Sequence, residues 1–588
     1  MTQEGSRWRT VLIPYLVLCL ICYLKGCFGD AAKKGVVIAA DAECRQIGSD
    51  FLNIKQGSAI DATIATMLCL GVKMPHAMGI GGGFNMVVYD RKSEQAEHID
   101  AREVSPMATD TDLFNRTDFL NNPNHLPMIK MGLLSIAIPG ELAGYWTAHQ
   151  RHGKLPWSEL FQPAIKLARY GHPMTHYTSA AINWWSKMRF DHSEFGTLCK
   201  ILCRPDGSLK QTGDDIKMLK LADTLELIAN KGPSVFYNGE LTDKLVEELN
   251  SQLNEDKHLT QFIPAGTQYF TREDFKNYEA KIRKPFTIKI GNLTMHAPTS
   301  PGGGPVLGFN LKLLEGYNLN VSHEGMDPVS EVKYYHRLAE VMKYGFAHRF
   351  QMGDSEATRE LVKKMADNKY INAVRNGIND VGYNKSSFYA NKLAKLDDGT
   401  LQLSVMSANG DAVSVTSSIN LPLGSYHVSE STGIIFNNQM HDFTYPTYNK
   451  TKFRTVNHDA NIIGPSKRPQ SSQSPAIFID KDGEVRYVVG AAGGRFIIPA
   501  ITQVVSSMLW LGNDVFTAID KARFTHTLIP FTLRYEREFN KAITRVLDIL
   551  GQKTSFFGSL PCIGRVEVIK QHQNGTIQGY SDKRKFVT

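Results

Sequence analysis

Three stretches of the sequence predict a fold that combines α-helices with β-strands. In residues 401–405, apolar and polar side chains alternate, which is the period of a half-buried strand. Residues 59–72 are mostly apolar and contain several alanines, as expected of a buried helix. Residues 141–152, 157–170 and 221–231 have the spacing of amphipathic helices. These periodicities predict mixed α and β structure and leave the arrangement of the layers open.

The spacing of apolar residues and the positions of turn residues predict the remaining elements in the same way. We expect strands at residues 36–40 and 86–89, and helices at residues 306–314 and 331–350. The run P-G-G-G-P at residues 301–305 predicts a loop before the first of these two helices. Residues 380–395 are polar, so we expect a mobile approach to residue 400.

The glycine-rich run at residues 79–83 is the one stretch that suggests a nucleotide site. It does not satisfy G-x-G-x-x-G, because Phe84 stands at the third glycine position and a strand rather than a helix follows. Close packing of two backbone segments is the better interpretation.

Length and composition describe a globular protein with a mildly basic surface. The chain has 588 residues, which exceeds the usual size of a single domain, and is 42% hydrophobic and 21% charged. The net charge of +8 and the pI near 8.8 leave room for an acidic substrate. No basic run accompanies that charge, so the composition argues against a nucleic-acid partner.

The strand at 401–405 starts beside Thr400 and is followed by a turn and a returning strand. A two-residue turn pairs residue 408 with 411 and sets Thr400 opposite Ile419. A three-residue loop with Gly410 in the left-handed position pairs 407 with 411 and sets Thr400 opposite Ser418. We prefer the second register, because it places two hydroxyls side by side with Asn420 just beyond.

A threonine at the start of a strand gains reactivity if the chain is cut before it. Its Oγ is then a nucleophile, and its own α-amine is the base that activates it. The alternative is an ordinary threonine in a half-buried hairpin, and this stretch by itself does not decide between the two.

Motifs spread along the chain favour the nucleophile over the ordinary threonine, because together they resemble those of a known family. They resemble the γ-glutamyltranspeptidase family, also called glutathione hydrolases, from about Gly35 to the end of the chain. The combination, in this order and at this spacing, is highly specific. The motifs are A-R-E-V-x-P (Ala101 to Pro106), H-x-M-G-I-G-G-G (His76 to Gly83), P-G-E-L-x-G-Y (Pro139 to Tyr145), D-x-G-T (Asp397 to Thr400), S-S-I-N-L-x-x-G-S (Ser417 to Ser425), G-I-I-F-N-N-x-M-x-D-F (Gly433 to Phe443), P-Q-S-S (Pro469 to Ser472) and V-V-G-A-A-G-G (Val488 to Gly494).

The resemblance implies a four-layer αββα sandwich of the N-terminal nucleophile hydrolase type, within the α+β class. It also implies cleavage between Gly399 and Thr400. The products are a large subunit (residues 30–399) and a small subunit (residues 400–588) that form one intertwined domain. It implies no cofactor and no metal.

The resemblance also assigns a γ-glutamyl binding site. Arg102 is expected to pair with the substrate α-carboxylate, helped by Ser471 and Ser472. Asn420 and Asp442 are expected to hold the substrate ammonium, beside Gln439.

Catalysis is expected at Thr400, with Ser418 next to it. Backbone N–H groups of Gly493 and Gly494 are expected to form the oxyanion hole. Thr400 forms an acyl-enzyme that water, an amino acid or a dipeptide releases. Taken alone, Arg102 could be a structural ion pair and the glycine pair a tight turn.

Several residues depart from the family pattern. Gln439 stands where the family has an acidic residue, so the ammonium loses one carboxylate, and His441 replaces a neighbouring acid. Gln402 replaces a histidine, and Asp398 stands where glycine is common. Arg495 follows the glycine pair where a small polar residue is usual. These departures predict reduced or lost activity.

Two hypotheses from different classes therefore stand. The first is a secreted γ-glutamyltransferase or glutathione hydrolase that cleaves γ-glutamyl amide bonds of glutathione and its conjugates. The second is a secreted, catalytically inactive relative, of the kind found in venoms, that acts by binding γ-glutamyl compounds or a protein surface.

Cysteine spacing predicts disulfide bonds rather than a metal site. Cys199 and Cys203 are close enough for a local bridge, and no second pair lies near them to complete a metal site. By resemblance, Cys44 pairs with Cys69. Cys562 is left as a buried thiol, and the other three cysteines fall in the N-terminal leader.

The N-terminus predicts translocation across a membrane. Two arginines precede an apolar run at residues 11–24, which is shorter than the roughly 20 residues of a transmembrane helix. We interpret residues 1–29 as a signal peptide that ends at a small-x-small site, with a type II membrane anchor through residues 11–24 as the alternative. Six sequons are then candidate glycosylation sites, and some such tripeptides occur by chance. They begin at Asn115, Asn292, Asn320, Asn384, Asn449 and Asn574.

Overall fold

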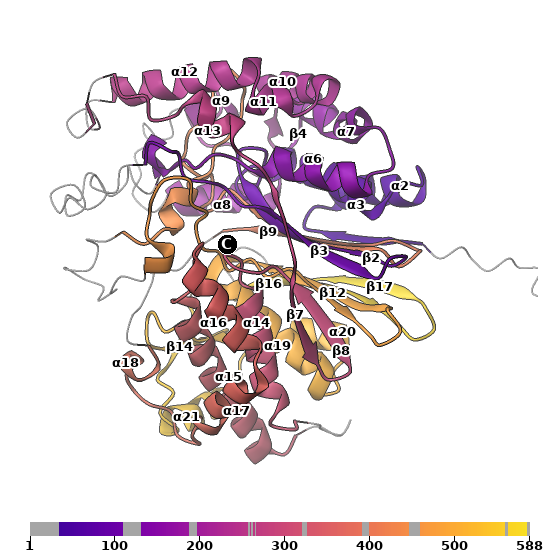
Figure 1. Ribbon diagram of the computed structural model, residues 1–588, viewed down its shortest axis with the longest axis vertical. Coiled ribbons are helices and arrows are strands. Elements are labelled where there is room, and N and C mark those ends of the chain that lie inside the picture. Colours follow the sequence, from indigo (N-terminus) through magenta and orange to yellow (C-terminus); the bar gives the residue numbers. More distant parts are fainter. Residues whose placement is uncertain are drawn as a thin grey trace, which may run out of the picture.

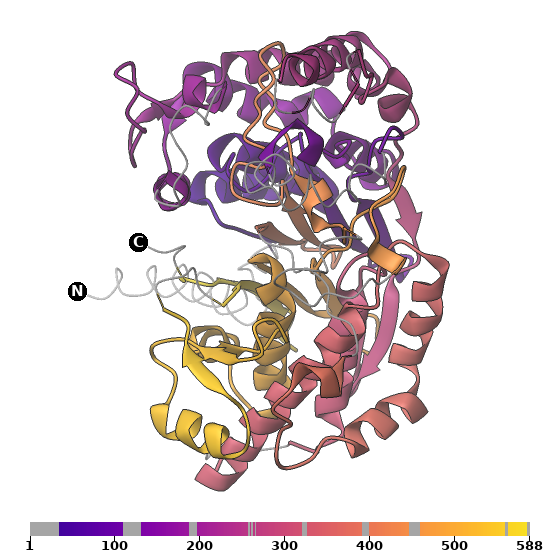
Figure 2. The same cartoon turned by 90° about the vertical axis from the view of Figure 1, so that its left-hand side faces the viewer.

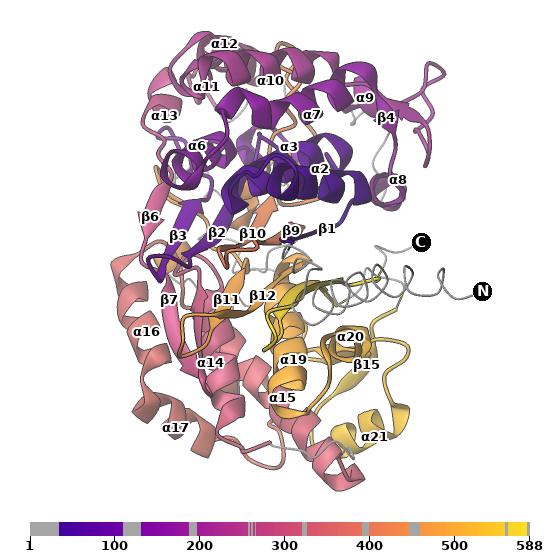
Figure 3. The ribbon, with the colours of Figure 1, turned by 90° about the vertical axis from the view of Figure 1, so that its right-hand side faces the viewer.

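The computed structural model describes residues 34–109, 131–186, 197–256, 259, 263–264, 266–319, 326–390, 399–445, 459–558 and 563–584. Two six-stranded sheets lie face to face in the middle of the molecule, and helices cover both outer faces (Figures 1 and 3). This is the four-layer αββα sandwich that the resemblance implied. The leader, Asp398, Cys562, Asn115, Asn320 and Asn449 lie outside the described residues.

The first sheet is antiparallel throughout, and the second and third strands in its order flank the turn after residue 400. Its strands, in spatial order, are β1 (Val36–Ala39), β9 (Leu401–Met406), β10 (Ala412–Ser418), β2 (Gly83–Asp90), β3 (Gln95–Ala101) and β6 (Lys281–Arg283).

The second sheet also combines strands from both sides of residue 400. Its order is β17 (Ile577–Ser581), β16 (Arg565–Gln571), β12 (Val485–Ala492), β11 (Ala476–Ile479), β8 (Leu293–Ala297) and β7 (Phe286–Ile290). Two smaller sheets contain β13 (Phe524–Thr525), β14 (Leu533–Tyr535) and β15 (Thr554–Phe556), and β4 (His172–Pro173) and β5 (Asp215–Ile216).

Helices of the N-terminal half cover the first sheet (Figure 1). They are α2 (Ala42–Asn53), α3 (Ala59–Lys73), α6 (Glu141–His152), α7 (Trp157–Tyr170), α8 (His176–Ser186), α9 (Cys199–Leu202), α10 (Leu219–Lys231), α11 (Ser234–Tyr237), α12 (Glu240–Glu255) and α13 (Arg272–Lys276). Bonds between Cys44 and Cys69 and between Cys199 and Cys203 are both present, as predicted.

Helices from the middle and C-terminal parts of the chain cover the second sheet (Figures 1 and 2). They are α14 (Gly304–Glu315), α15 (Pro328–Arg349), α16 (Glu356–Ala366), α17 (Asn368–Asn376), α18 (Ser386–Tyr389), α19 (Ile497–Trp510), α20 (Val515–Asp520) and α21 (Lys541–Ile549). Within the ranges given above, every helix is too short or too polar to span a bilayer, and no cluster of metal-ligating side chains occurs.

Most predicted helices occur at or within a few residues of the expected positions, and the structure differs from the prediction most at α14, at α15 and in the approach to residue 400. The loop predicted at 301–305 ends early, because α14 already begins at Gly304 with Pro305 in its first turn, where proline is favourable. Helix α15 begins at Pro328, three residues before the predicted start, because Asp327 caps it. The polar approach at 380–395 contains α18, and Tyr389 is buried with its hydroxyl donating to Glu340 at 2.7 Å.

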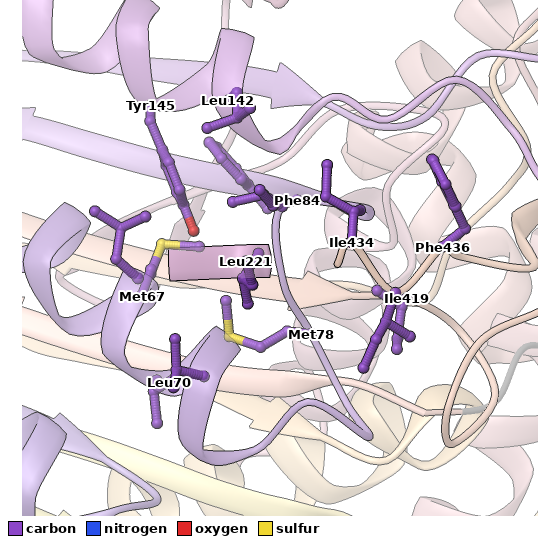
Figure 4. Close-up of a cluster of buried hydrophobic side chains, with 14 of the residues drawn as sticks. Met67, Leu70, Met78, Phe84, Leu142, Tyr145, Leu221, Ile419, Ile434 and Phe436 are labelled. Carbon is purple, nitrogen blue, oxygen red and sulfur yellow. The ribbon is translucent and has the colours of Figure 1, made fainter. Parts of the chain in front are cut away.

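The core between the first sheet and its helices is apolar. Figure 4 shows side chains from α3, α6, β2 and the segments after β10 meeting there, among them Met67, Leu142, Phe84 and Ile434. Leu401, Leu403 and Val405 of β9 belong to this core. The other face of β9 turns toward the second sheet, and it carries Thr400 at its start.

The glycine-rich run before β2 allows two backbones to touch, as predicted. A Cβ at Gly82 would lie 2.2 Å from the carbonyl oxygen of Ser418, and one at Gly81 would lie 2.1 Å from that of Ile435. Side chains cannot fit at these distances, so the run holds the end of β10 in place.

Candidate active site

Thr400 lies at the start of β9, and the hairpin sets Ser418 across from it. Gln402 pairs with Thr416 and Leu401 with Ser417, so the next pair in this register is Thr400 with Ser418. The loop closes where the Ser407 N–H donates to the Asp411 carbonyl at 2.9 Å. Gly410 has φ +97, so the predicted three-residue loop is confirmed and the two-residue turn is excluded.

The hydroxyls of Thr400 and Ser418 have different partners. The Gly493 N–H donates to Thr400 Oγ at 2.8 Å, and Thr400 is only 3% exposed. Ser418 Oγ donates to the Gly399 carbonyl at 3.2 Å and accepts the Asn420 N–H at 2.7 Å. We expected the Ser418 hydroxyl, across from Thr400, to be within hydrogen-bond reach of the Thr400 Oγ or amine. It contacts the carbonyl before Thr400 instead, because the Asn420 N–H fixes its oxygen.

Gly399 occupies a position that only glycine fits. Its φ is +64, a conformation that L side chains rarely adopt, and a Cβ there would lie 1.7 Å from the Asn420 carbonyl oxygen. The bond between Gly399 and Thr400 is therefore held against the backbone that follows Ser418.

The glycine pair at the end of β12 brings a backbone amide to Thr400. Gly493 has φ +119 and Gly494 has φ +54, and the short 3₁₀ turn η6 (Gly494–Phe496) starts there. The two left-handed residues turn the chain out of the sheet, which directs the Gly493 N–H at the Thr400 oxygen.

Arg102 directly follows β3 and is buried in an ion pair with Asp442. Its Nη2 donates to Asp442 Oδ2 at 2.6 Å, and both side chains are almost fully buried. Its Nη1 lies 3.4 Å from Glu103 Oε2. The groups expected to bind the substrate carboxylate and the substrate ammonium therefore neutralise each other in the protein without substrate.

The segment with Ser471 and Ser472 surrounds the same arginine. Arg102 donates to the Pro469 and Gln470 carbonyls at 3.2 and 3.1 Å. Ser471 Oγ accepts the Gln473 N–H at 3.2 Å. The backbone of this segment thus contacts Arg102 at the two residues that directly precede the serine pair.

A second buried arginine, which the sequence did not indicate, orients Ser472. Arg349 lies at the end of α15, and its Nε donates to Ser472 Oγ at 2.9 Å. Its Nη1 donates to Gln470 Oε1 at 3.0 Å. Ser472 Oγ is therefore an acceptor toward the Arg349 guanidinium.

Asn420 and Gln439 connect the threonine to this pocket. Asn420 Nδ2 donates to the Asn438 carbonyl at 3.1 Å, and the next residue, Gln439, is fully buried. The Gln439 side chain lies beside Glu103, a carboxyl whose pKa is raised by burial. A continuous set of contacts therefore runs from Gly399 through Ser418 and Asn420 to Arg102.

Two buried carboxyl groups beside this network were not assigned a role from the sequence, although both lie in motifs quoted above. Burial raises the pKa of Glu103 to about 7 and that of Glu141 to about 8. Glu141 accepts hydrogen bonds from the Tyr145 hydroxyl at 2.6 Å and from Ser417 Oγ at 3.0 Å. The sequence did contain a signal for these two carboxyl groups, because each is a charged residue inside a motif with several small or apolar residues.

Gln402, one of the departures from the family pattern, lies between the two sheets. Its amide donates to Ser414 Oγ at 3.1 Å and accepts from Thr416 Oγ at 2.6 Å. A Cβ at Gly490 of β12 would lie 2.1 Å from the Gln402 amide. Gln402 therefore fills the space between the sheets and supports the strand that carries Thr400.

Replacing Glu141 with glutamine is expected to reduce the loss of stability with rising pH. The unfolded glutamate loses its proton near pH 4.5 and the folded one near pH 8, so the folded state binds more protons in this window and stability falls as pH rises. Glu141→Gln removes that contribution, and up to about 5 kcal/mol less stability should be lost across the window, because each unit of pKa difference corresponds to about 1.4 kcal/mol. Chemical unfolding measured at several pH values checks this, with the exposed Glu538→Gln as control. Equal pH slopes in both variants would contradict it.

Comparison with known proteins shows the family of this chain. The model of the γ-glutamyltranspeptidase family matches residues 44–586. The chain belongs to the γ-glutamyltranspeptidase family. Among its relatives are scoloptoxin SSD14 of Scolopendra dehaani, 36% identical over 93% of this chain and 91% of that protein, and the human glutathione hydrolase 5 proenzyme, 32% identical over 95% and 93%.

Solved structures support the same fold for this γ-glutamyltranspeptidase family member. Cephalosporin acylase from Bacillus halodurans is similar with a TM-score of 0.76, covers 95% of both chains and is 23% identical. The likeness at this identity concerns the fold, which is that of the N-terminal nucleophile hydrolases.

Proposed function

We propose that this γ-glutamyltranspeptidase family member is a secreted γ-glutamyl hydrolase and transferase that acts on glutathione and its conjugates. The observation that carries the proposal is the geometry around Thr400. Its Oγ receives the Gly493 N–H at 2.8 Å, while Ser418 donates to the preceding carbonyl at 3.2 Å. Relatives named glutathione hydrolases support the substrate class.

Cleavage before Thr400 comes first. Thr400 Oγ attacks the Gly399 carbonyl carbon, and Ser418 Oγ–H stabilises the negative charge that develops on the carbonyl oxygen. The amide bond breaks as its nitrogen takes the proton from Thr400 Oγ and the acyl group moves to Oγ, which frees the Thr400 α-amine. Hydrolysis of the ester then frees Oγ and leaves a carboxylate on Gly399. The printed name of the human relative, a proenzyme, supports such a maturation step.

The two fragments, residues 30–399 and 400–588, remain together after the cut. β9 pairs with β1 and β10 with β2, and β11 pairs with β8, so each sheet contains strands of both fragments. Separating the fragments would expose both sheets and the cores behind them. A heterodimer of the two fragments is therefore the working form.

The γ-glutamyl head binds between Arg102 and Asp442. The substrate carboxylate replaces Asp442 as the partner of Arg102 and also accepts from Ser471 and Ser472. The substrate ammonium then takes Asp442, with Asn420 and Gln439 as neutral acceptors. A zwitterion suits this site because it replaces a buried ion pair with two new ones and leaves no charge unpaired.

Acyl transfer follows at Thr400. The α-amine takes the proton from Oγ, which attacks the γ-carbonyl of the substrate. The N–H groups of Gly493 and Gly494 stabilise the oxyanion, and the amine half of the substrate leaves with the proton. Water or the amine of an amino acid or dipeptide then releases the γ-glutamyl group from Thr400.

Secretion accounts for the leader, the disulfides and the sequons. Asn292, Asn384 and Asn574 are exposed, as glycan acceptors must be. Two disulfides are typical of a protein that folds outside the reducing cytosol. The venom relative, scoloptoxin SSD14, supports an extracellular role.

A second candidate function is binding without catalysis. Gln439 supports it, because a buried amide at this position contributes no charge toward a substrate ammonium. In this alternative the protein retains the fold and the pocket and acts by binding γ-glutamyl compounds or a protein surface, without catalysing a reaction.

One experiment separates these outcomes. The secreted chain is expressed, run reduced on a denaturing gel, and assayed with a chromogenic γ-glutamyl anilide with and without a dipeptide acceptor. We expect two fragments, the smaller with the N-terminal sequence Thr-Leu-Gln-Leu, and release of the aniline. An uncut chain without activity rejects the enzymatic function, and a cut chain without activity supports binding without catalysis.

A further inference from the structure

Three hairpin turns lie side by side at one end of the second sheet. They are the turns at residues 291–292 between β7 and β8, 480–484 between β11 and β12, and 572–576 between β16 and β17. β8 pairs with β11, and β12 pairs with both β11 and β16, each antiparallel, so the three turns are neighbours. Gly493 follows the other end of β12, about 25 Å away along the strand, so these turns are separate from the candidate active site.

The turns enclose a groove of about 730 Å³ that two sequon asparagines line. Asn292 lies between β7 and β8, and Asn574 lies between β16 and β17. Neighbouring strands are about 4.8 Å apart, so the three steps from β8 to β16 place the two asparagines roughly 14 Å from each other. Both are exposed, and each begins an N-x-T sequon. The third sequon asparagine of the described ranges, Asn384, is also exposed but does not line this groove.

Asn574 is held in an orientation that suits an attached glycan. Its side-chain Oδ1 accepts the Thr576 N–H at 3.0 Å, which fixes the amide group. Among the described residues, none accepts a hydrogen bond from its Nδ2, the atom to which an N-glycan is attached. A glycan on Asn574 therefore starts at the wall of the groove and breaks no hydrogen bond of the protein.

The walls of the groove offer both apolar and polar contacts. Tyr487 of β12 is half-buried, and its ring meets that of Phe478 edge to face with 6.4 Å between the centres, which fixes its position. Such a side chain combines an apolar face with a polar tip, which matches the C–H groups and hydroxyls of a sugar ring. The Lys570 ammonium is 5.9 Å from the centre of the Tyr487 ring, where it is a donor. Gln571 also lines the groove, and its Oε1 is buried without a hydrogen-bond partner in the described part of the chain.

The charges of the groove favour a neutral ligand. Asp480 pairs with Arg486 at 2.6 Å, and Asp482 pairs with Lys481 at 3.5 Å. These two pairs cancel, so Lys570 is left as the one uncompensated charge among the acidic, lysine and arginine side chains that line the groove. A neutral molecule rich in hydroxyl and amide groups therefore suits it better than an anion, and the core of an N-glycan is such a molecule.

We propose that the N-glycans of Asn292 and Asn574 lie in this groove, with their innermost sugars against Tyr487. The inference rests on the secretion included in the proposed function, because N-glycans belong to the surface loops of secreted chains. The two asparagines adjoin β7 and β17, which are the edge strands of the second sheet. Glycans held there shield the ends of both edge strands, whose unpaired backbone groups can pair with another chain.

The test measures how strongly the groove protects each glycan. The chain is secreted from insect cells, and peptide N-glycosidase releases the glycans from native and from denatured protein while mass spectrometry follows each sequon. We expect Asn292 and Asn574 to be occupied, and native protein to release their glycans about tenfold more slowly than denatured protein. Contacts worth about 1.4 kcal/mol are enough for this factor. Asn384, outside the groove, is the control and should be released at similar rates from both.

A substitution in the groove tests whether contacts with the glycan cause the protection. Tyr487→Leu keeps an apolar side chain and removes the aromatic ring, so release from native protein should approach the rate of denatured protein. Tyr170→Leu is the matched control, because Tyr170 is 73% exposed on α7, which covers the other sheet. It should leave the rates unchanged, and thermal melts check that both variants are folded. As a second measurement, Asn574→Gln should lower the melting temperature, whereas Asn384→Gln should not.

Two outcomes overturn this inference. They are a bare Asn292 or Asn574 in the secreted protein, and release of their glycans from native protein as fast as from denatured protein. Hydrolysis of the γ-glutamyl anilide is measured on the same preparations. An active protein with either outcome keeps the proposed function and loses the inference, whereas an inactive protein with protected glycans does the reverse. A chain that stays in the cell without glycans rejects secretion and the inference together.

Discussion

Replacing Gly399 with alanine is expected to leave the chain uncut and inactive. The added Cβ would lie 1.7 Å from the Asn420 carbonyl oxygen, so the backbone at Gly399 or after Ser418 must move. Either movement takes the Gly399 carbonyl away from Ser418 Oγ and from Thr400 Oγ. A denaturing gel should show a single band in place of two, and hydrolysis of the γ-glutamyl anilide should be lost.

The matched control is Gly558→Ala. Gly558 also has a positive φ, +76, but a Cβ there meets no atom within 4 Å. It carries the same backbone strain, about 1–2 kcal/mol, without the steric overlap. If Gly399→Ala is cut as fast as Gly558→Ala, the carbonyl is not held as we describe. Thr400→Ser keeps a hydroxyl and should still be cut, whereas Thr400→Ala should not.

Replacing Asp442 with asparagine is expected to lower kcat/KM by about 30-fold to several thousand-fold, the effect of losing one charge of a desolvated pair. Asp442 is the carboxylate that pairs with Arg102 at 2.6 Å, so the substitution also leaves the arginine without this partner in the free protein. Kinetics on the γ-glutamyl anilide check the loss, and a thermal melt checks that the variant is folded. A folded and cut Asp442→Asn protein with unchanged kcat/KM would refute the ammonium assignment.

A substitution that adds a negative charge tests the same pocket, because it is expected to increase kcat/KM. Gln439→Glu restores a carboxylate, and kcat/KM should rise about tenfold or more, mainly through a lower KM. Glu103 is the neighbour of this position, and burial keeps its pKa near 7. The gain should therefore be larger below pH 7, where Glu103 keeps its proton and does not repel the new charge. If Gln439→Glu changes nothing in a cut protein, the cause of weak activity lies elsewhere, with His441 and Arg495 as the remaining candidates.

The sequence was most informative where a local pattern has one physical solution. The alternation at 401–405 predicted the strand. The three-residue loop predicted the register, which matters because a shift of one residue would turn every side chain to the opposite face of the sheet. Helices α6 and α7 begin and end at the predicted residues. The start of α14 was placed late, because a P-G-G-G-P run predicts a loop even where its second half enters a helix.

The candidate site was only partly readable in the sequence. Arg102, Asn420, Asp442 and the glycine pair were assigned by resemblance. Gln402 was noted only as a departure from the family pattern, and the structure shows that it packs between the sheets. Arg349 was missed, because nothing in the period of α15 distinguishes an arginine that turns inward from one that faces solvent. Glu103 and Glu141 were also missed, although each is a charged residue inside a quoted motif.

The sequence by itself determined the family, the hairpin with Thr400 at its start, and the substitutions that alter the pocket. These depend on residue identity and short-range spacing, which the sequence states directly. Tertiary structure alone decided which groups are partners: Arg102 with Asp442, Ser418 with the Gly399 carbonyl, Gly493 with Thr400. Those contacts join residues up to 340 positions apart, and their strength depends on burial, so only the assembled sandwich brings them together and removes them from water.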